Sequence, residues 1–302
     1  MKKMLTIILL FGILILTYTY KTEIVNIIIE NVIKKTEINL SYKNPYYLTY
    51  NYNYIKNVNN FTLKDKNDLL NLYFTIINSG VSSFEFYCPK EYETCIKDVI
   101  DLANEQEELS NINGFVHPFN SFDTIETAYD SLGRVKLKII KTYTDVEINE
   151  LNKKVNEIVT SEVKDEQDPK KIIKIIHDYI INNAKYDKDR TDNNIIKYAS
   201  NTAYGVLFEG YGICSGYADA MALFLNYYKI PNFKVVSENH VWNAVYIEGS
   251  WYHLDLTWDD PILDNGEDAL YYDYFLISTE QLEKLDKTQH LFDKKVFSEL
   301  AY

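Results

Sequence analysis

The stretch Gly212-Ile213-Cys214-Ser215-Gly216-Tyr217-Ala218 decides the fold, together with His240-Val241-Trp242-Asn243 and Asp255-Leu256-Thr257-Trp258 further along the chain. These segments supply a cysteine, a histidine and an aspartate in that order. A cysteine attacks as thiolate, so it needs a base, and the base needs a group that orients it. Cys214, His240 and Asp255 are therefore the candidate catalytic residues.

Cys214 is expected at the N-terminus of a helix. Gly210-Tyr211-Gly212-Ile213 has the composition of a turn, and the residues from Ser215 to Leu225 are those of a helix with small side chains in its opening turns. Free amides and the helix dipole at such an end favour anions, so they stabilise a thiolate and can donate to an oxyanion. The competing interpretation is an inert, buried cysteine.

The histidine and the aspartate are expected on two strands of one hairpin. Val241 to Ile247 and Trp251 to Thr257 alternate as strands, and Glu248-Gly249 fits a two-residue turn. If Ile247 pairs with Ser250, then His240 lies opposite Thr257, and Asp255 is a diagonal neighbour about 7–8 Å away on the same face. His253 shares that face and is the rival base or orienting group.

From about Asp168 to Phe275 the chain resembles the transglutaminase-like superfamily, a branch of the papain-like cysteine enzymes. The resemblance rests on the three segments above and on Ile176-His177-Asp178-Tyr179-Ile180, Lys185-Tyr186-Asp187, Ala203-Tyr204-Gly205-Val206-Leu207 and Trp258-Asp259-Asp260-Pro261. It implies an α+β fold in which the helix bearing Cys214 packs on an antiparallel sheet. It also implies that Cys214 is the nucleophile, His240 the base and Asp255 the orienting group.

The activity expected from this resemblance is acyl transfer at an amide through a thioester on Cys214, with a protein or peptide as substrate. Water as acceptor would give a peptidase or amidase, and an amine would give a transglutaminase; the exposed setting favours water. The alternative is a non-catalytic surface module that keeps the fold. The sequence identifies neither the substrate nor the oligomeric state.

Composition limits the partners. The 302 residues are 46% hydrophobic, enough for a substantial core, and 44 acidic against 31 basic residues give a net charge of −13. Such a charge repels nucleic acid and accommodates a neutral or cationic substrate more easily. We expect no cofactor and no metal: zinc-ligand spacings are missing from the sequence, and the acidic loop Asp259–Asp268 fails the calcium-loop pattern. We interpret the segment Asp259–Asp268 as a solvated loop.

The N-terminus has the layout of a secretory signal. Lys2 and Lys3 precede an apolar run from Met4 to Leu16, with no small-residue cleavage site after it. We expect residues 1–20 to be an uncleaved signal anchor that holds an extracellular catalytic domain at the cell membrane; a cleaved signal and a secreted protein are the alternative. In an oxidising compartment Cys88 and Cys95 form a disulfide, or else remain two buried thiols, while Cys214 stays free.

Four segments are expected along the chain. After the signal segment 1–20 come a lead-in at 21–44, a small α+β domain at 45–165 and the catalytic domain at 168–302. Tyr50, Tyr52 and Tyr54 alternate with asparagines and predict a strand, whose aromatic face would suit sugar stacking; in a chain with 27 tyrosines, composition alone also explains the cluster. His117 is interpreted as a turn residue. The other expected elements are helices at about 62–78, 93–109, 145–163 and from Pro169, and strands at 84–87, 123–129 and 135–142.

Overall fold

The computed structural model describes residues 10, 12–13, 15–23, 27, 44–59, 62–261 and 269–301. The predicted signal segment 1–20 and lead-in 21–44 lie largely outside these residues. Within the part of the chain that is described, no helix is both long enough and apolar enough to cross a membrane.

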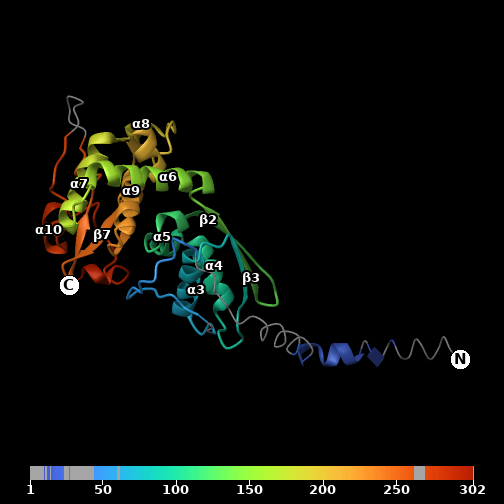
Figure 1. The fold of residues 1–302 in the computed structure, drawn as a ribbon. Helices are drawn as coiled ribbons and strands as arrows, with labels where there is room; N and C mark the ends of the chain where they lie inside the picture. Colours follow the sequence, from blue (N-terminus) through green and yellow to red (C-terminus); the bar gives the residue numbers. More distant parts are fainter. Residues whose placement is uncertain are drawn as a thin grey trace.

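The fold is mixed α+β, as predicted (Figure 1). The N-terminal half contains α3 (Lys66–Asn78), β1 (Ser83–Tyr87), α4 (Cys95–Asn104), α5 (Gln106–Gly114), η1 (Pro118–Asn120), β2 (Phe122–Tyr129), β3 (Arg134–Lys141) and α6 (Asp145–Ile158). It is followed by η2 (Val159–Val163), α7 (Pro169–Asn183), β4 (Lys185–Tyr186), α8 (Lys188–Asn193), η3 (Gly205–Glu209), β5 (Tyr211–Gly212), α9 (Cys214–Tyr227), β6 (Asn232–Val236), β7 (Val241–Ile247), β8 (Ser250–Leu254), α10 (Thr279–Leu285) and η4 (Ser298–Leu300).

The antiparallel sheet β6-β7-β8 is buried on both faces, and its residues alternate between two cores. Phe233, Val235, Trp242 and Ala244 belong to a core shared with α3, α4 and α5. On the other face Val245 and Ile247 pack with α7 and α9 (Figure 1). The predicted 45–165 and 168–302 units therefore share both hydrophobic clusters, and the boundary between them stays a prediction.

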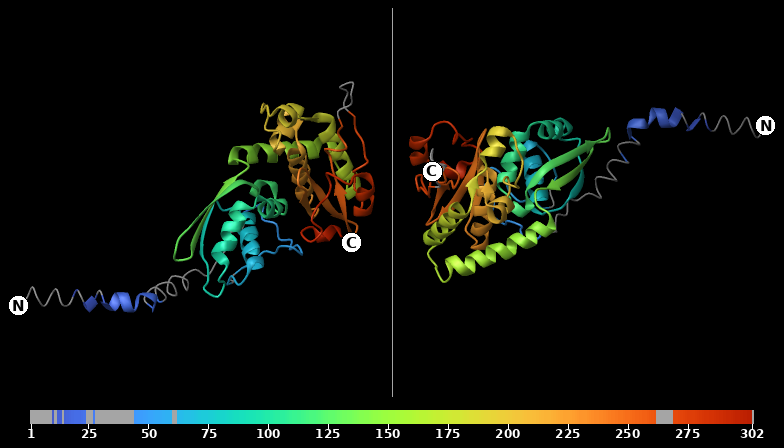
Figure 2. Two further views of the ribbon diagram at one scale, coloured as in Figure 1. Left: turned by 180° about the vertical axis from the view of Figure 1, so that it is seen from behind. Right: turned by 90° about the horizontal axis from the view of Figure 1, so that it is seen from above.

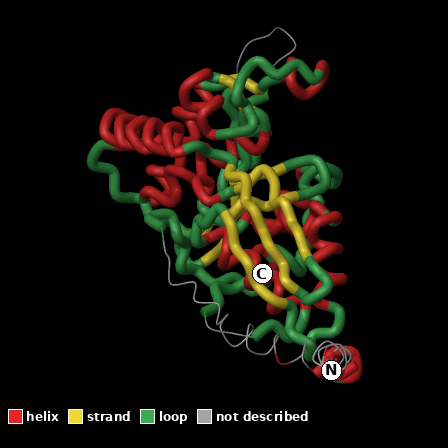
Figure 3. Tube along the Cα trace, turned by 90° about the vertical axis from the view of Figure 1, so that its right-hand side faces the viewer, coloured by secondary structure: helices red, strands yellow, loops and turns green. Residues whose placement is uncertain are grey.

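The N-terminal helices approach the sheet closely at the end of α5. A side chain at Gly114 would place its Cβ only 2.4 Å from the carbonyl oxygen of Lys234 in β6, so glycine permits this contact. Beyond these helices lies the second antiparallel sheet, in the order β1-β3-β2, whose long strands run side by side in Figure 3. In β3 the residues Val135, Leu137 and Ile139 are buried and the intervening residues are exposed, apart from the half-buried Lys141 at its end.

Helix α6 connects the two halves, and it extends from the β3 end of the molecule towards α7 (Figure 2). Thr144 and Glu147 form a capping box at its start. Asp168 caps the next helix, α7, by accepting hydrogen bonds from the amides of Lys170 and Lys171, with Pro169 in the first turn as predicted.

Two predicted helices in the N-terminal half have different boundaries. The helix expected at 93–109 is broken at Glu105, whose ψ of 93° is extended, and continues as α5. The break lets Ile112 and Phe115 enter the same core as Leu102. The helix expected at 62–78 starts at Lys66, because the side chain of Asp65 accepts from the amide of Asp68 and caps it there.

The predicted tyrosine strand is wrong: residues 44–59 contain no strand. Asparagine side chains replace the partners that a neighbouring strand would supply. Asn78 accepts from the amide of Leu48 through Oδ1 (3.0 Å) and donates to the carbonyl oxygen of Leu48 through Nδ2 (2.8 Å). Tyr52 is buried and donates to the carbonyl oxygen of Asn232 (3.0 Å), whereas Tyr50, two residues earlier, is exposed, so the alternation of tyrosine and asparagine does not follow burial here.

Cys88 and Cys95 form a disulfide, with 5.7 Å between their Cα atoms, and Cys214 is the free cysteine. Of the two interpretations of this pair, the bridge is therefore confirmed and the two buried thiols are wrong. The bridge connects the end of β1 to the first residue of α4. Both sulfurs are removed from competition with Cys214 for oxidants and electrophiles.

The disulfide should have a modest effect on stability because the loop that it closes is short. The double variant Cys88→Ala/Cys95→Ala is expected to lower the free energy of unfolding by less than the ~3 kcal/mol associated with a 15-residue loop. Denaturant unfolding measures this difference. Non-reducing mass analysis of protein made in an oxidising compartment should find one free thiol; three free thiols would contradict the bridge.

Candidate active site

Cys214 begins helix α9, as expected. The preceding residue, Ile213, is extended, and its amide donates to the carbonyl oxygen of Ser200 (2.8 Å). Gly216 lies against the same carbonyl: a Cβ at this position would be 2.2 Å from the Ser200 oxygen. This close approach fixes the first turn of the helix against the 199–202 segment and so fixes the thiol.

The amides of the first turn of α9 are available to an anion. The backbone bond from Tyr217 to Ile213 is where the helical ladder begins, so the amides of Cys214, Ser215 and Gly216 precede it. No side chain caps this end, since Ile213 makes no side-chain hydrogen bond. The helix dipole and these amides favour negative charge at Cys214, either on the thiolate or on an oxyanion beside it.

His240 precedes β7 and is buried beside the thiol. Its Nε2 donates to Oδ2 of Asp255 (2.5 Å). The indole of Trp242 stacks on the imidazole, with 5.6 Å between ring centroids and 16° between planes. Trp258 lies edge-on at 6.4 Å. The two tryptophans pack against the imidazole and hold its orientation.

The hairpin register carries Asp255 to this position. Ile247 pairs with Ser250, as predicted, and Glu248 and Gly249 both have positive φ, which a tight two-residue hairpin turn requires. The strand ends at Leu254, three residues earlier than expected, so His240 has no partner at Thr257. Asp255 instead begins a turn in which its Oδ1 accepts from the amide of Thr257 (2.9 Å).

Burial and ion pairing oppose one another in this dyad. Burial alone lowers the pKa of His240, but the Asp255 carboxylate, and after it the Cys214 thiolate, outweigh burial and raise that pKa to about 10. Burial raises the pKa of Asp255, and His240 and His290 more than reverse this, so the pKa of Asp255 lies well below its usual range. At neutral pH the geometry therefore favours an imidazolium paired with the Asp255 carboxylate.

These shifts link the site to stability. Because the pKa of His240 is raised on folding, its contribution is complete below the unfolded value of about 6.5 and is lost as pH rises through about 10. Because the pKa of Asp255 is lowered, its contribution is present above about 3.9 and is lost as pH falls towards the folded value. The two contributions are therefore both complete between about pH 3.9 and pH 6.5.

His290 completes the site, and the sequence did not predict it. Its Nε2 donates to Oδ2 of Asp255 (2.8 Å), the oxygen that His240 also contacts, and its Nδ1 lies 2.7 Å from Oδ2 of Asp286. The ring is 4% exposed and stacks on Tyr274. Both nitrogens face carboxylates, which only accept. The signal in the sequence was Asp286 four residues before His290, a spacing too common to single out.

His253 is not the base. Its Nδ1 accepts from the indole N–H of Trp242 (2.9 Å), and its Nε2 lies 2.9 Å from the hydroxyl of Thr279. Burial, and then the nearby His290, lower the pKa of His253 to about 3, so the ring is neutral. Both nitrogens are used inside the fold, where they join β7 and β8 to α10.

The prediction of a solvated acidic loop is wrong for its first two residues. Residues 262–268 of this loop lie outside the part of the chain that the structure describes. Asp259 and Asp260 are buried, not solvated. Asp259 contacts Nε2 of His177 (3.1 Å) and accepts from the amide of Tyr274 (2.9 Å), and Asp260 accepts from the hydroxyl of Tyr217. These bonds tie the turn after Asp255 to α7 and α9.

The ligand atoms of His240, Asp255 and His290 lie within 4.8 Å of one another, and their types suit a zinc ion. Each of these atoms already takes part in an imidazole–carboxylate hydrogen bond. A metal would have to break both bonds, so the donor set fits a proton network better than a metal site.

A cleft of about 1030 Å³ opens over Cys214 and His240. One wall comes from α5, with Glu107, Ser110 and Asn111, and another from the 288–293 segment. The N-terminal half therefore contributes to the cleft, which the sequence did not indicate. Among the described lining residues there is no lysine or arginine, whereas Glu107, Glu238 and Asp293 are acidic.

Comparison with known proteins finds a family resemblance in the central segment. Residues 156–256 match the model of the transglutaminase-like superfamily, a range that contains Cys214, His240 and Asp255 and starts in α6, before the predicted boundary at Asp168. No curated protein matches the sequence. A solved structure titled "Crystal structure of a TGase" is 15% identical over 45% of this chain and 45% of that chain, with a TM-score of 0.34.

His290 should position Asp255 and tune the site without touching substrate. His290→Ala removes one of two imidazole donors from a buried carboxylate, so the free energy of unfolding should fall by ~1–3 kcal/mol. The pH dependence of Cys214 alkylation should also shift, because Asp255 then interacts with His240 alone.

His177→Ala is the matched control, since His177 is equally buried and also contacts two carboxylates, Asp178 and Asp259. It should lose stability and keep the pH profile of alkylation. Identical profiles for both variants would assign His290 a purely structural role.

Proposed function

We propose that the transglutaminase-like domain at residues 156–256 catalyses acyl transfer from an amide to an acceptor through a thioester on Cys214. The observation that carries this proposal is the placement of Cys214 at an uncapped helix N-terminus, beside a buried imidazole that is hydrogen-bonded to Asp255. These are the three parts that an activated thiol requires: a thiolate, a base and an orienting carboxylate.

The reaction follows from these positions. The Cys214 thiolate attacks the amide carbonyl carbon, and the oxyanion that forms is stabilised by the amides of the first turn of α9. As the C–N bond breaks, protonated His240 gives its proton to the leaving amine, which leaves a thioester. The acceptor then loses its proton to His240 as it attacks the thioester, and the thiolate is released with the imidazolium restored.

Water is the proposed acceptor. Cys214 is half-buried at the floor of an open cleft, so bulk water reaches the thioester, and hydrolysis gives a peptidase or amidase. An amine acceptor would make the protein a transglutaminase, and the three carboxylates that line the cleft would also attract a protonated amine. The two acceptors give different products from one thioester.

The proposed substrate is a neutral or cationic protein or peptide, for instance a surface protein or a wall peptide. The cleft is large enough for several residues of extended chain, and its acidic rim disfavours anionic segments. Nucleic acid is disfavoured for the same reason and by the net charge of −13.

The rival function is a non-catalytic surface module with the same fold. Its cysteine would have no need of a base. At about pH 6–7 Cys214 should alkylate faster than a model thiol, and His240→Ala should remove the advantage. Rates that do not differ between the unaltered chain and this variant would favour the binding module.

The thioester itself provides the direct test. The full chain is incubated with a cell-surface protein extract, quenched in acid and digested, and the Cys214 peptide is weighed by mass spectrometry. An adduct sensitive to hydroxylamine is expected, and Cys214→Ala should lack it. Adding dansylcadaverine distinguishes the acceptors, because fluorescent product forms only if an amine is accepted.

The protein is also proposed to act outside the cell membrane, attached through its N-terminal segment or secreted. The apolar run from Met4 to Leu16 and the Cys88–Cys95 disulfide both support export, since disulfides persist in oxidising compartments.

Protease added to intact cells should digest the chain beyond about Lys21. A cytoplasmic protein of known location, followed in the same samples, reports whether the cells stayed intact. Full protection until lysis would overturn the proposed location.

A further inference from the structure

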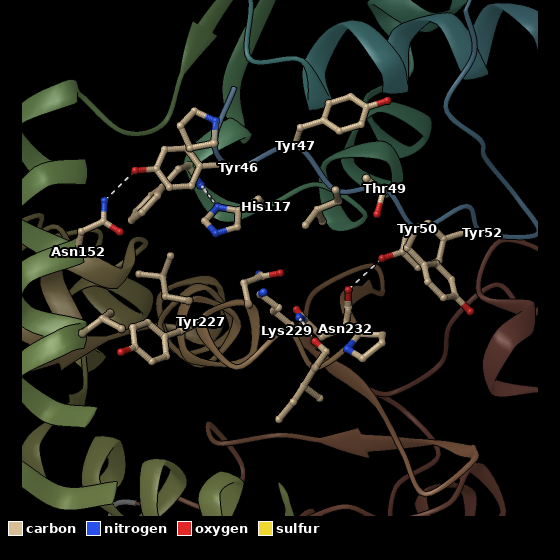
Figure 4. Close-up of a pocket in the computed structure, with 18 of the residues that line it drawn as sticks. Tyr46, Tyr47, Thr49, Tyr50, Tyr52, His117, Asn152, Tyr227, Lys229 and Asn232 are labelled. Carbon is tan, nitrogen blue, oxygen red and sulfur yellow. Dashed lines mark hydrogen bonds between the residues drawn. The ribbon is translucent and has the colours of Figure 1, made fainter. Parts of the chain in front are cut away.

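A second cavity, of about 830 Å³, lies at the opposite end of α9 from the thiol (Figure 4). Its walls are the Pro45–Tyr52 segment, α6 at Asn152 and Val155, and the turn from the end of α9 into β6. The 14 residues of α9 separate it from Cys214 by about 20 Å, at 1.5 Å per residue. None of the described residues that line it also lines the catalytic cleft.

The lining of this cavity is aromatic and uncharged apart from one lysine. It includes the tyrosines 46, 47, 50, 52 and 227, and Tyr47 and Tyr227 lie on opposite walls (Figure 4). Among the described lining residues there is no carboxylate, and Lys229 carries the charge. The chain as a whole has a net charge of −13, so a cavity without carboxylates differs from the rest of the protein. Its lysine disfavours a cationic ligand.

His117 presents a hydrogen-bond donor to the cavity. The side chain is 7% exposed, and its Nδ1 accepts from the amide of Phe119 (3.1 Å). Burial, and then nearby Lys234, lower the pKa of His117 to about 3, so the ring is neutral and its proton is on Nε2. This N–H has no acceptor in the part of the chain that the structure describes. Figure 4 shows the ring between Tyr46 and Lys229.

Three asparagines present acceptors to the same cavity. Asn152 donates to the hydroxyl oxygen of Tyr46 (2.7 Å), Asn226 to the carbonyl oxygen of Ala222 (2.8 Å) and Asn232 to that of Ile230 (2.9 Å). Each amide nitrogen is thus used inside the protein. The three side-chain carbonyl oxygens have no partner among the described residues, so they are available to ligand hydroxyl groups.

We propose that this cavity binds a neutral oligosaccharide. A sugar ring has an apolar face of C–H bonds, which pack on the negative face of a tyrosine ring, and an edge of hydroxyl groups. The hydroxyl groups donate to the asparagine carbonyls, and a hydroxyl or acetamido oxygen accepts from Nε2 of His117. The volume falls within the range of ~300–1,000 Å³ found for ligand pockets. This site is separate from the proposed acyl transfer and does not depend on it.

The test is calorimetric titration of the full chain with three neutral tetrasaccharides: chitotetraose, cellotetraose and maltotetraose. At least one should bind at a single saturable site. Tyr227→Ala and Asn226→Ala should each weaken that binding about tenfold or more, because they remove a stacking face and an acceptor. Thermal unfolding of each variant verifies that it is folded.

Tyr129→Ala is the matched control, since Tyr129 is 53% exposed on β2 and Tyr227 is 47% exposed on the cavity wall. It should bind as the unaltered chain does, and so should Cys214→Ala. The cavity variants should alkylate at Cys214 at the unaltered rate. Absence of binding by all three sugars at millimolar concentration would overturn the proposal. So would equal affinity in Tyr227→Ala, or a tetraglycine peptide that binds with the same dependence on Tyr227.

Discussion

The carboxylate of Asp255 is the constraint on which the rest of the site depends. It is 2% exposed, and a charge this deeply buried is costly unless it is paired and hydrogen-bonded. Its Oδ2 accepts from His240 and His290, and its Oδ1 accepts from the turn amides that follow. One side chain therefore connects the hairpin, the turn beyond it and the C-terminal segment that carries Asp286 and His290.

That connection explains why the site extends past the segment that matches the family. The matched residues end at 256, yet His290 and the 288–293 wall of the cleft lie beyond them, and Glu107 of α5 lies before them. The sheet β6-β7-β8 makes this arrangement possible, because α9 covers one face and the N-terminal helices cover the other. Gly114, in contact with β6, allows α5 to lie close against this sheet.

Local patterns predicted the parts of the fold in which local chemistry dominates. The Glu248-Gly249 turn needs two positive φ angles, so it set the hairpin register, and with it the meeting of His240 and Asp255. Asp168 and Pro169 likewise fixed the start of α7. The length of β8 was not predictable, because Asp255 leaves the strand to donate its amide to the carbonyl oxygen of Tyr274, far along the chain.

Hydrogen bonds between residues distant in sequence account for the predictions that were wrong or missing. Asp259 and Asp260 resemble members of a solvated acidic run. Hydrogen bonds from His177 and Tyr217 offset the desolvation cost of burying them. Alternating tyrosines resemble a strand, but asparagine side chains satisfy that backbone instead. His290 has no motif around it, so only its contact with Asp255 reveals it. In each case a polar partner distant in sequence overrode the local pattern.

Helix α9 gives the molecule two separate positions for chemistry. Its N-terminus concentrates positive potential on Cys214, and its far end, with the turn into β6, forms one wall of the tyrosine-lined cavity. A buried helix is rigid, so it fixes the distance between the cavity and Cys214. A polymer bound at the cavity would therefore keep its other segments near the cleft. Tethering of this kind raises the effective concentration of a weakly held acyl donor, with no further contact at the thiol. Under the two proposals, a glycan that bears peptides would meet both requirements, because its sugar rings would pack on the tyrosines and its neutral or basic peptide would lie in the acidic cleft.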